Sequence, residues 1–342
     1  MKIRTFEENR KLFIKKIIAV IGLLLIVAIL VVGIIFAVNK QKEKEYLESY
    51  GMTAVTVGDY EITYDLYRSL YLNHRDDLIA AHTKDGVTDT KALDSAIRTS
   101  VLNDARYIYA IISLASENGL SIESADVKAV ADTYIEEMKA YCSDNGESYE
   151  KMLEDGYITE PAFEFLQKVI ALEKVLFTSL KASGEIKSDD TEVLEIINGN
   201  DFARVKIIFI GENGKSAEAN RAEAQRALEE YNGGESFDSL IGLYSKEVPA
   251  EAYVIRGERE AVIESAIFAL KDGEVSEVIE GEKGFYVILR LEKDAEYITS
   301  HFNDLKEKYQ SIELQNKIKA RSNTLTATES EYVRALAYEE IK

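Results

Sequence analysis

The sequence is poor in the residues that build disulfides, metal clusters and rigid linkers. Its 342 residues include one cysteine, Cys142, together with three histidines, two prolines and no tryptophan. A single cysteine excludes an intramolecular disulfide, a cysteine zinc cluster and a Cys-x-x-Cys redox pair. The histidines, His74, His82 and His301, do not share the spacing of metal ligands on one helix, such as H-x-x-x-H. We therefore expect neither a metal site nor a cofactor.

Positive charge is also scarce. The chain has 41 Lys and Arg residues against 61 Asp and Glu residues, which gives a net charge of −20. A nucleic-acid-binding protein needs clustered positive charge to neutralise phosphates, so we expect no nucleic acid among the partners. Hydrophobic residues make up 46% and charged residues 30% of the chain, which is ordinary for a folded globular protein.

One long apolar run occurs near the N-terminus. Residues 17–38 (IIAVIGLLLIVAILVVGIIFAV) form a stretch of 22 residues without a charge. At ~1.5 Å per residue such a helix is about 33 Å long, enough to cross a hydrocarbon core of ~30 Å. A cleaved signal peptide has a shorter apolar region and a small-x-small cleavage site, which the following residues do not contain. We predict that residues 17–38 are an uncleaved transmembrane signal anchor.

The charges beside this run predict its orientation. Residues 1–16 carry six Lys and Arg residues and two Glu residues, a net charge of +4. The side of a membrane helix that is richer in Lys and Arg stays in the cytoplasm. We therefore expect a single-pass protein of the cell membrane, with a cytoplasmic tail at 1–16 and residues 41–342 outside the cytoplasm.

The spacing of apolar residues predicts a helical domain over residues 41–198. Residues 52–63 alternate apolar and polar around Gly58-Asp59, which predicts a short hairpin. Beyond it, apolar positions recur every three or four residues in 91–117, 124–142 and 159–182, which predicts three amphipathic helices. Pro161 lies in the first turn of the third helix, where its missing N–H is harmless.

The periodicity changes to two at about residue 200. The segments 203–210 (ARVKIIFI) and 284–292 (GFYVILRLE) predict strands, and three helices are expected between them. We predict a compact α+β domain over 200–294, inserted in the helical domain, and a C-terminal helix in 295–342 that returns to that domain. The predicted fold class is α+β, with an N-terminal transmembrane helix, an all-helical domain and an inserted α+β domain.

Two sequence blocks resemble a known family. The segments RAEAQRALEEYNGGESFDSLIGLYSKE (221–247) and RGEREAVIESAIFALKDGEVSEVIEGEKGFYVILRLE (256–292) resemble, in order and spacing, the two halves of the parvulin-type (rotamase) peptidyl-prolyl isomerases. The helical flanks resemble the chaperone region of extracytoplasmic foldases of the SurA and PrsA type. The resemblance implies a parvulin-like domain at 200–294 and a SurA-like or PrsA-like helical domain around it.

The same resemblance implies where the catalytic residues would lie, and this sequence departs from the family there. Parvulins surround the prolyl amide with two facing histidines and an acidic residue or cysteine. The histidine positions align with Lys206 and Tyr286, and the acidic position aligns with Glu247. Between residues 200 and 294 there is no histidine. Glu247 also fits a solvated surface carboxylate, and Tyr286 also fits a strand aromatic that packs on a neighbour.

The pocket that binds the prolyl ring in the family is altered as well. Its methionine aligns with Arg259, its aromatic residue with Ile263, and a second aromatic position is kept as Phe268. These three residues are the candidate substrate-binding residues. An arginine in place of an apolar wall disfavours prolyl binding, because an unpaired charge resists desolvation.

The leading hypothesis is a membrane-anchored extracytoplasmic foldase or chaperone whose parvulin-like domain has weak or no isomerase activity. Its partners would be unfolded or partly folded exported polypeptides. Two alternatives stay open. The first is a working prolyl isomerase that uses Glu247 and Tyr286. The second is an assembly or structural protein of the cell envelope that uses the parvulin fold as a binding module.

Overall fold

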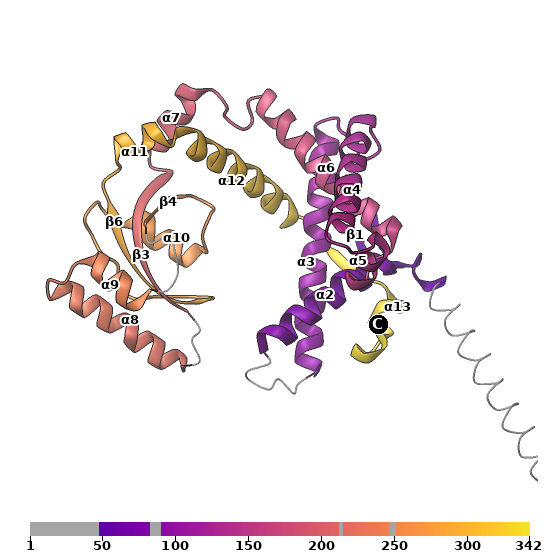
Figure 1. Ribbon diagram of the computed structural model, residues 1–342, viewed down its shortest axis with the longest axis horizontal. Coiled ribbons are helices and arrows are strands. Elements are labelled where there is room, and N and C mark those ends of the chain that lie inside the picture. Colours follow the sequence, from indigo (N-terminus) through magenta and orange to yellow (C-terminus); the bar gives the residue numbers. More distant parts are fainter. Residues whose placement is uncertain (1–47, 83–89, 212–214, 246–250) are drawn as a thin grey trace, which may run out of the picture. The chain divides into compact units, whose positions relative to one another are not determined.

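A computed structural model describes residues 48–82, 90–211, 215–245 and 251–342 (Figure 1). The predicted tail 1–16 and transmembrane segment 17–38 lie outside these residues. Within the described ranges, no helix is both long enough and apolar enough to cross a membrane. The chain forms two compact units. The first takes its described residues from 1–105, 138–164 and 326–342, and the second from 106–137 and 165–325.

The first unit contains a small antiparallel sheet that joins the two ends of the described chain. Strands β1 (Thr53–Val57) and β2 (Tyr60–Thr63) form a hairpin. Its turn contains Gly58 with φ +59°, a conformation that glycine adopts without steric cost. The third strand, β7 (Ala327–Glu329), pairs with β1 to give the order β2-β1-β7. The hairpin predicted in residues 52–63 is confirmed.

Helix α2 (Tyr64–His82) supplies the aromatic core of this unit. Tyr64, Tyr67 and Tyr71 are almost fully buried, because spacings of three and four residues place them on one helix face. Their rings stack, with centroids 6.4 and 6.1 Å apart. Tyr332 of the C-terminal helix α13 (Glu331–Ala335) meets the Tyr64 ring edge-on at 5.2 Å.

The longer helices follow the predicted spacing closely. They are α3 (Thr90–Glu117), α4 (Ala125–Asp144) and α6 (Glu160–Ala182), and short α5 (Tyr149–Asp155) precedes α6. The helix α7 (Asp190–Asn198) follows, and the side chain of its N-cap residue Asp189 accepts hydrogen bonds from the Thr191 and Glu192 N–H groups. Such a cap satisfies backbone donors that the first helical turn leaves unpaired.

The second unit contains a four-stranded antiparallel sheet of order β4-β3-β6-β5. The strands are β3 (Phe202–Gly211), β4 (Glu251–Ile255), β5 (Ile279–Gly281) and β6 (Gly284–Leu291). The alternating pattern predicted β3 and β6 with three helices between them, so neither β4 nor β5 was predicted. Strand β5 has three residues and β4 has five, which is too short for an alternating pattern to stand out.

Helices cover both faces of this sheet (Figure 1). On one face, helices α8 (Ala217–Asn232) and α9 (Phe237–Tyr244) enclose a core with Ile208, Ile210 and Val287. On the other face, α10 (Ala261–Ala269) packs on Val205 and Ile288. Residues of β3 therefore alternate between the two helical layers, as the pleat of a strand requires.

The segment after residue 294 differs from the single returning helix that was predicted. It consists of α11 (Ala295–Ser300), α12 (Phe302–Ser322), β7, α13 and a 3₁₀ turn at Tyr338–Glu340. Within the second unit, Leu305 and Tyr309 of α12 pack on Tyr253 and Ile255 of β4. This apolar surface belongs to β4, the strand that sequence periodicity missed.

Candidate functional site

The central feature of the candidate site is a pair of aromatic side chains that face each other across two strands. Phe209 of β3 lies directly opposite Tyr286 of β6 in the antiparallel register. Their ring centroids are 4.7 Å apart with a tilt of 36°, within the range of favourable aromatic contacts. Both side chains are half-buried and lie on the α10 face of the sheet.

The structure does not bring Lys206 and Tyr286 together. Lys206 precedes Phe209 by three residues, so it points to the opposite face of the sheet. Its Nζ lies 2.6 and 2.8 Å from the two carboxylate oxygens of Asp238 on α9. Tyr286 instead packs against the cluster on the α10 face. If the family's two histidines face each other, the position opposite Tyr286 is Phe209 and not Lys206.

A signal for Phe209 was present in the sequence. Gly211 and Gly284 are opposite each other where β3 and β6 meet, and counting two residues inward from both glycines reaches Phe209 and Tyr286. A side chain on Gly284 would place its Cβ 2.3 Å from the Ile210 carbonyl oxygen. The close approach of the strands at this end therefore requires glycine.

Gly211 also makes room for the Phe209 ring. A Cβ on Gly211 would lie 2.8 Å from two carbon atoms of that ring, which is well inside van der Waals contact. The ring therefore lies over the Gly211 backbone.

A carboxylate lies next to the aromatic pair. Glu260, the residue before α10, accepts a hydrogen bond of 2.8 Å from the Glu282 N–H. A Cβ built on Gly281 would lie 3.0 Å from both a Glu260 carboxylate oxygen and the Tyr286 ring. Glu260 is therefore an acidic neighbour of Tyr286 that the sequence analysis did not select. Nothing in its spacing distinguished it from other glutamates in an acidic chain.

Glu247, the predicted acidic residue, lies outside the described residues. The last described residue before Glu247 is Ser245, whose Oγ accepts a hydrogen bond of 3.3 Å from the Phe209 N–H. The described chain therefore leaves α9 beside the aromatic pair, two residues before Glu247.

The three predicted substrate-binding residues differ in exposure. Ile263 is 2% exposed and belongs to the core between α10 and the sheet. Phe268 is half-buried, and the guanidinium carbon of Arg256 lies 4.0 Å from its ring centroid. Arg259 is exposed, with its Nε 3.7 Å from a Glu258 carboxylate oxygen. These residues do not form one apolar pocket wall, because one is core and one is charged and solvated.

The site therefore offers apolar contact and few titratable groups. Two half-exposed aromatic rings can bind an apolar side chain, and the Tyr286 phenol can act as a hydrogen-bond donor. The pair supplies no imidazole, because one of its members is Phe209 and the other is Tyr286. In the part of the chain that the structure describes, no cluster of three His, Cys, Asp or Glu side chains could hold a metal ion.

Two family models match the chain. The model of the SurA-like N-terminal domain matches residues 3–176, and the model of the PPIC-type peptidyl-prolyl isomerase domain matches residues 204–330. The chain belongs to the SurA/PrsA-like family of parvulin-type foldases. The family resemblance inferred from the two sequence blocks and the helical flanks is confirmed.

This chain shares low sequence identity with individual members of the foldase family. The foldase protein PrsA of Staphylococcus aureus strain Newman is 26% identical over 200 residues, which cover 54% of this chain and 59% of the relative. The chain thus spans about three fifths of the length of that curated relative. The crystal structure of PrsA from Bacillus anthracis is 14% identical, with a TM-score of 0.35 over 63% of this chain and 94% of that one. The crystal structure of PrsA from Streptococcus pneumoniae is 19% identical, with a TM-score of 0.33 over 80% of this chain and 93% of that one.

Proposed function

We propose that the protein is a membrane-anchored extracytoplasmic foldase that binds unfolded exported polypeptides, and that its parvulin-type domain isomerises prolyl bonds weakly or not at all. The observation that carries the second part concerns the two positions that align with the family's histidines. Tyr286 packs against the apolar ring of Phe209 at 4.7 Å, and Lys206 is paired with Asp238 on the other face of the sheet. The first part is supported by the matches to both foldase domain models.

The chemistry of the pair supports weak catalysis. Prolyl isomerisation has a barrier of ~18–20 kcal/mol and involves no covalent step that a side chain could share. Catalysis therefore depends on polar groups placed around the twisted amide. Loss of one such contact at a transition state costs about 2.7–4 kcal/mol by analogy with oxyanion donors. Phe209 has no polar atom, and Tyr286 has a single hydroxyl, so most of that stabilisation is missing.

Anchoring and localisation are supported by the sequence of the N-terminal region. The uncharged stretch at 17–38 is long enough to span a bilayer, and the +4 charge of residues 1–16 favours a cytoplasmic tail. We propose a single-pass protein of the cell membrane with residues 41–342 outside the cytoplasm. In spheroplasts, added protease should then digest residues beyond about 41 without permeabilisation. Full protection of the large domains would contradict this topology.

The decisive experiment compares isomerisation and holding in the full chain, purified in detergent. A protease-coupled assay with a proline peptide measures isomerisation, and light scattering of a denatured client measures holding. We expect an isomerisation rate close to the uncatalysed rate together with suppressed aggregation. The double variant Phe209→His and Tyr286→His serves as a matched gain-of-function control, because it restores two imidazoles in the facing positions.

Two other outcomes would overturn the proposal. A rate comparable to that of a histidine-bearing parvulin, lost in Tyr286→Phe, would make the protein a working isomerase. Aggregation suppressed for one envelope protein and for no other client would instead favour an assembly factor. Holding activity that is unchanged in Tyr286→Phe supports the foldase function with a degenerate isomerase site.

A further inference from the structure

Four apolar side chains and one glutamate form a stripe along the part of α6 that belongs to the second unit. Its members recur at steps of four, three, four and three residues, so they share one helix face. They are Leu166, Ile170, Glu173, Phe177 and Leu180. Ile170 is 49% exposed, and Tyr107 on neighbouring α3 is 38% exposed. Leu166, Glu173 and Phe177 are half-buried, and Leu180 is buried.

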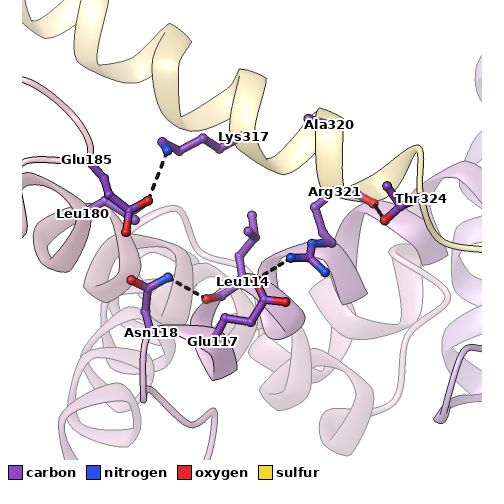
Figure 2. A pocket seen from close by; sticks show the side chains of 9 residues that line it. All are labelled: Leu114, Glu117, Asn118, Leu180, Glu185, Lys317, Ala320, Arg321 and Thr324. Carbon is purple, nitrogen blue, oxygen red and sulfur yellow. Dashed lines mark hydrogen bonds and ion pairs between the residues drawn. The ribbon is translucent and has the colours of Figure 1, made fainter.

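The stripe leads to a cavity of about 740 Å³ between the ends of α3 and α6 and the last turns of α12 (Figure 2). Leu114, Leu180 and Ala320 provide apolar lining. Leu114 follows Tyr107 by two helical turns, just as Leu180 follows Glu173 by two turns. A cavity of this volume can take one or two large side chains of a ligand.

The carboxylates at the cavity already have cationic partners. Lys317 Nζ lies 3.2 Å from a Glu185 carboxylate oxygen, and Arg321 forms an ion pair with Glu117 (Figure 2). These pairs connect α12 to α3 at Glu117 and to the segment after α6 at Glu185. The cavity itself therefore presents balanced charge and an apolar lining.

Glu173 differs from these carboxylates. It is half-buried, and among the described residues it has no ion pair and no hydrogen bond. The lysines of its own helix have other neighbours: Lys168 pairs with Glu123 at 3.2 Å, Lys174 lies over the Tyr134 ring at 5.5 Å, and Lys181 lies over the Phe177 ring at 4.2 Å.

Burial raises the pKa of Glu173. The pKa of Tyr107 is raised by its own burial and, to a smaller extent, by the negative charge of Glu173. A partly desolvated carboxylate without a partner is stabilised by an incoming cation or N–H donor.

We infer that the α6 stripe and the cavity at its end form a groove that binds an extended client segment, with a basic side chain of the client at Glu173 and an apolar side chain in the cavity at Leu114 and Leu180. The inference deepens the proposed foldase function, since it names the class of client segment. Leu180 follows Glu173 by seven helical positions, about 10 Å at ~1.5 Å per residue. An extended chain covers that length in about three residues. The favoured spacing is therefore Lys or Arg three positions from a large apolar residue.

The test measures the binding of short fluorescent peptides to the full chain in detergent micelles by anisotropy. One peptide carries Lys-x-x-Phe, a second carries Glu-x-x-Phe, and a third places Lys and Phe side by side. Each is also made in the reverse order. We expect the wild type to prefer the first over the second by about tenfold, a modest coupling on the affinity scale. The third peptide should bind less tightly than the first.

Three variants locate the site. Glu173→Gln should abolish the preference for lysine, whereas Glu137→Gln, which removes the same charge from an exposed position on α4, should keep it. This control separates the site from the general attraction of a chain with net charge −20 for cations. Ala320→Phe should fill the cavity from an exposed position, so it should weaken all Phe-containing peptides and keep the preference for lysine.

The inference and the proposed function fail in different ways. An unchanged lysine preference in Glu173→Gln, or no peptide binding at all, would overturn the groove even if the protein suppresses aggregation. If the wild type does not suppress aggregation but still prefers the lysine peptide, the foldase function is overturned and the groove is supported. A change of oligomeric state in Glu173→Lys, seen by analytical ultracentrifugation without any peptide preference, would assign this face to a second copy of the chain and refute the client site.

Discussion

Arg98 holds the C-terminal segment of the first unit in place, and replacing it should detach that segment. The Arg98 guanidinium donates a hydrogen bond of 2.9 Å to Asp94 and bonds of 3.2 and 3.3 Å to Glu329. It also donates to the carbonyl oxygens of Val333 at 3.2 Å and Leu336 at 2.9 Å. One planar side chain on α3 therefore satisfies two carboxylates and two backbone acceptors.

The effect of Arg98→Met can be estimated from burial. The Arg98 side chain is 14% exposed and the Glu329 side chain is 11% exposed, so the carboxylate is largely removed from water. Methionine keeps most of the packing of the arginine stem. Among the described residues, Glu329 then keeps the Tyr67 hydroxyl, 2.7 Å away, as its hydrogen-bond donor. Breaking a buried pair by removing one partner costs about 3–5 kcal/mol. Arg98→Lys should lie between, because an ammonium cannot reproduce the planar fork.

Hydrogen exchange is the suitable assay, because it reports the free energy of local opening without assuming two-state unfolding of a chain with two units. Arg98→Met should accelerate exchange of the β7 amides and of the Ser330 N–H, which donates to the Ala54 carbonyl. Lys151→Met is the matched control, because Lys151 pairs with Asp155 in an exposed position and such pairs contribute at most about 1 kcal/mol. A loss below about 1 kcal/mol in Arg98→Met would refute the claim that this network fixes the C-terminal segment.

Three further predictions concern the second unit. Gly211→Val should lower stability by about 1–3 kcal/mol in urea unfolding, because its Cβ displaces the Phe209 ring; an unchanged midpoint would contradict the close contact. Glu173→Gln should stabilise the protein at neutral pH. The pKa of Glu173 is higher in the native state than in the unfolded chain, so the wild type loses stability as the pH rises from the unfolded to the native pKa, and glutamine avoids this loss. This gain should vanish below the ordinary carboxyl pKa of about 4, and a pH-independent gain would exclude the titration. Lys206→Met should change stability by less than about 1 kcal/mol and leave isomerisation unchanged, since the Lys206–Asp238 pair is partly solvated.

Local patterns in the sequence predict the helices and the hairpin well. The spacing of apolar residues in 91–117 corresponds to α3 at Thr90–Glu117, and the segment 159–182 corresponds to α6 at Glu160–Ala182. These elements depend on contacts between residues three or four positions apart, so their signal is contained in short windows. The hairpin likewise depends on one turn, at Gly58.

Elements that depend on distant partners were not predictable in the same way. Strand β7 has three residues and pairs with β1 from the other end of the described chain, so no local window shows it. The register of β3 on β6 decides that Phe209, and not Lys206, faces Tyr286. A displacement of three residues moves a side chain to the opposite face, which is why the two positions selected by motif matching, Lys206 and Tyr286, lie on different faces of the sheet. Glu173 was missed because an unpaired carboxylate can be recognised only when its surroundings are known.

The Phe209–Tyr286 pair and the groove at Glu173 offer different interactions to a client, and this difference indicates what the parvulin-type domain contributes. At Phe209 and Tyr286 the fold keeps a facing pair and the glycines that allow it, while the pair itself lacks an imidazole that could titrate near neutral pH. A site that keeps its shape and apolar area but has few polar contacts retains affinity more readily than catalysis, because catalysis requires stronger interactions in the transition state than in the ground state. The groove at Glu173 adds charge recognition that the aromatic pair does not provide. A foldase with these two surfaces would bind apolar segments at one and basic, apolar segments at the other, and linked weak sites bind a flexible chain more tightly than either site alone.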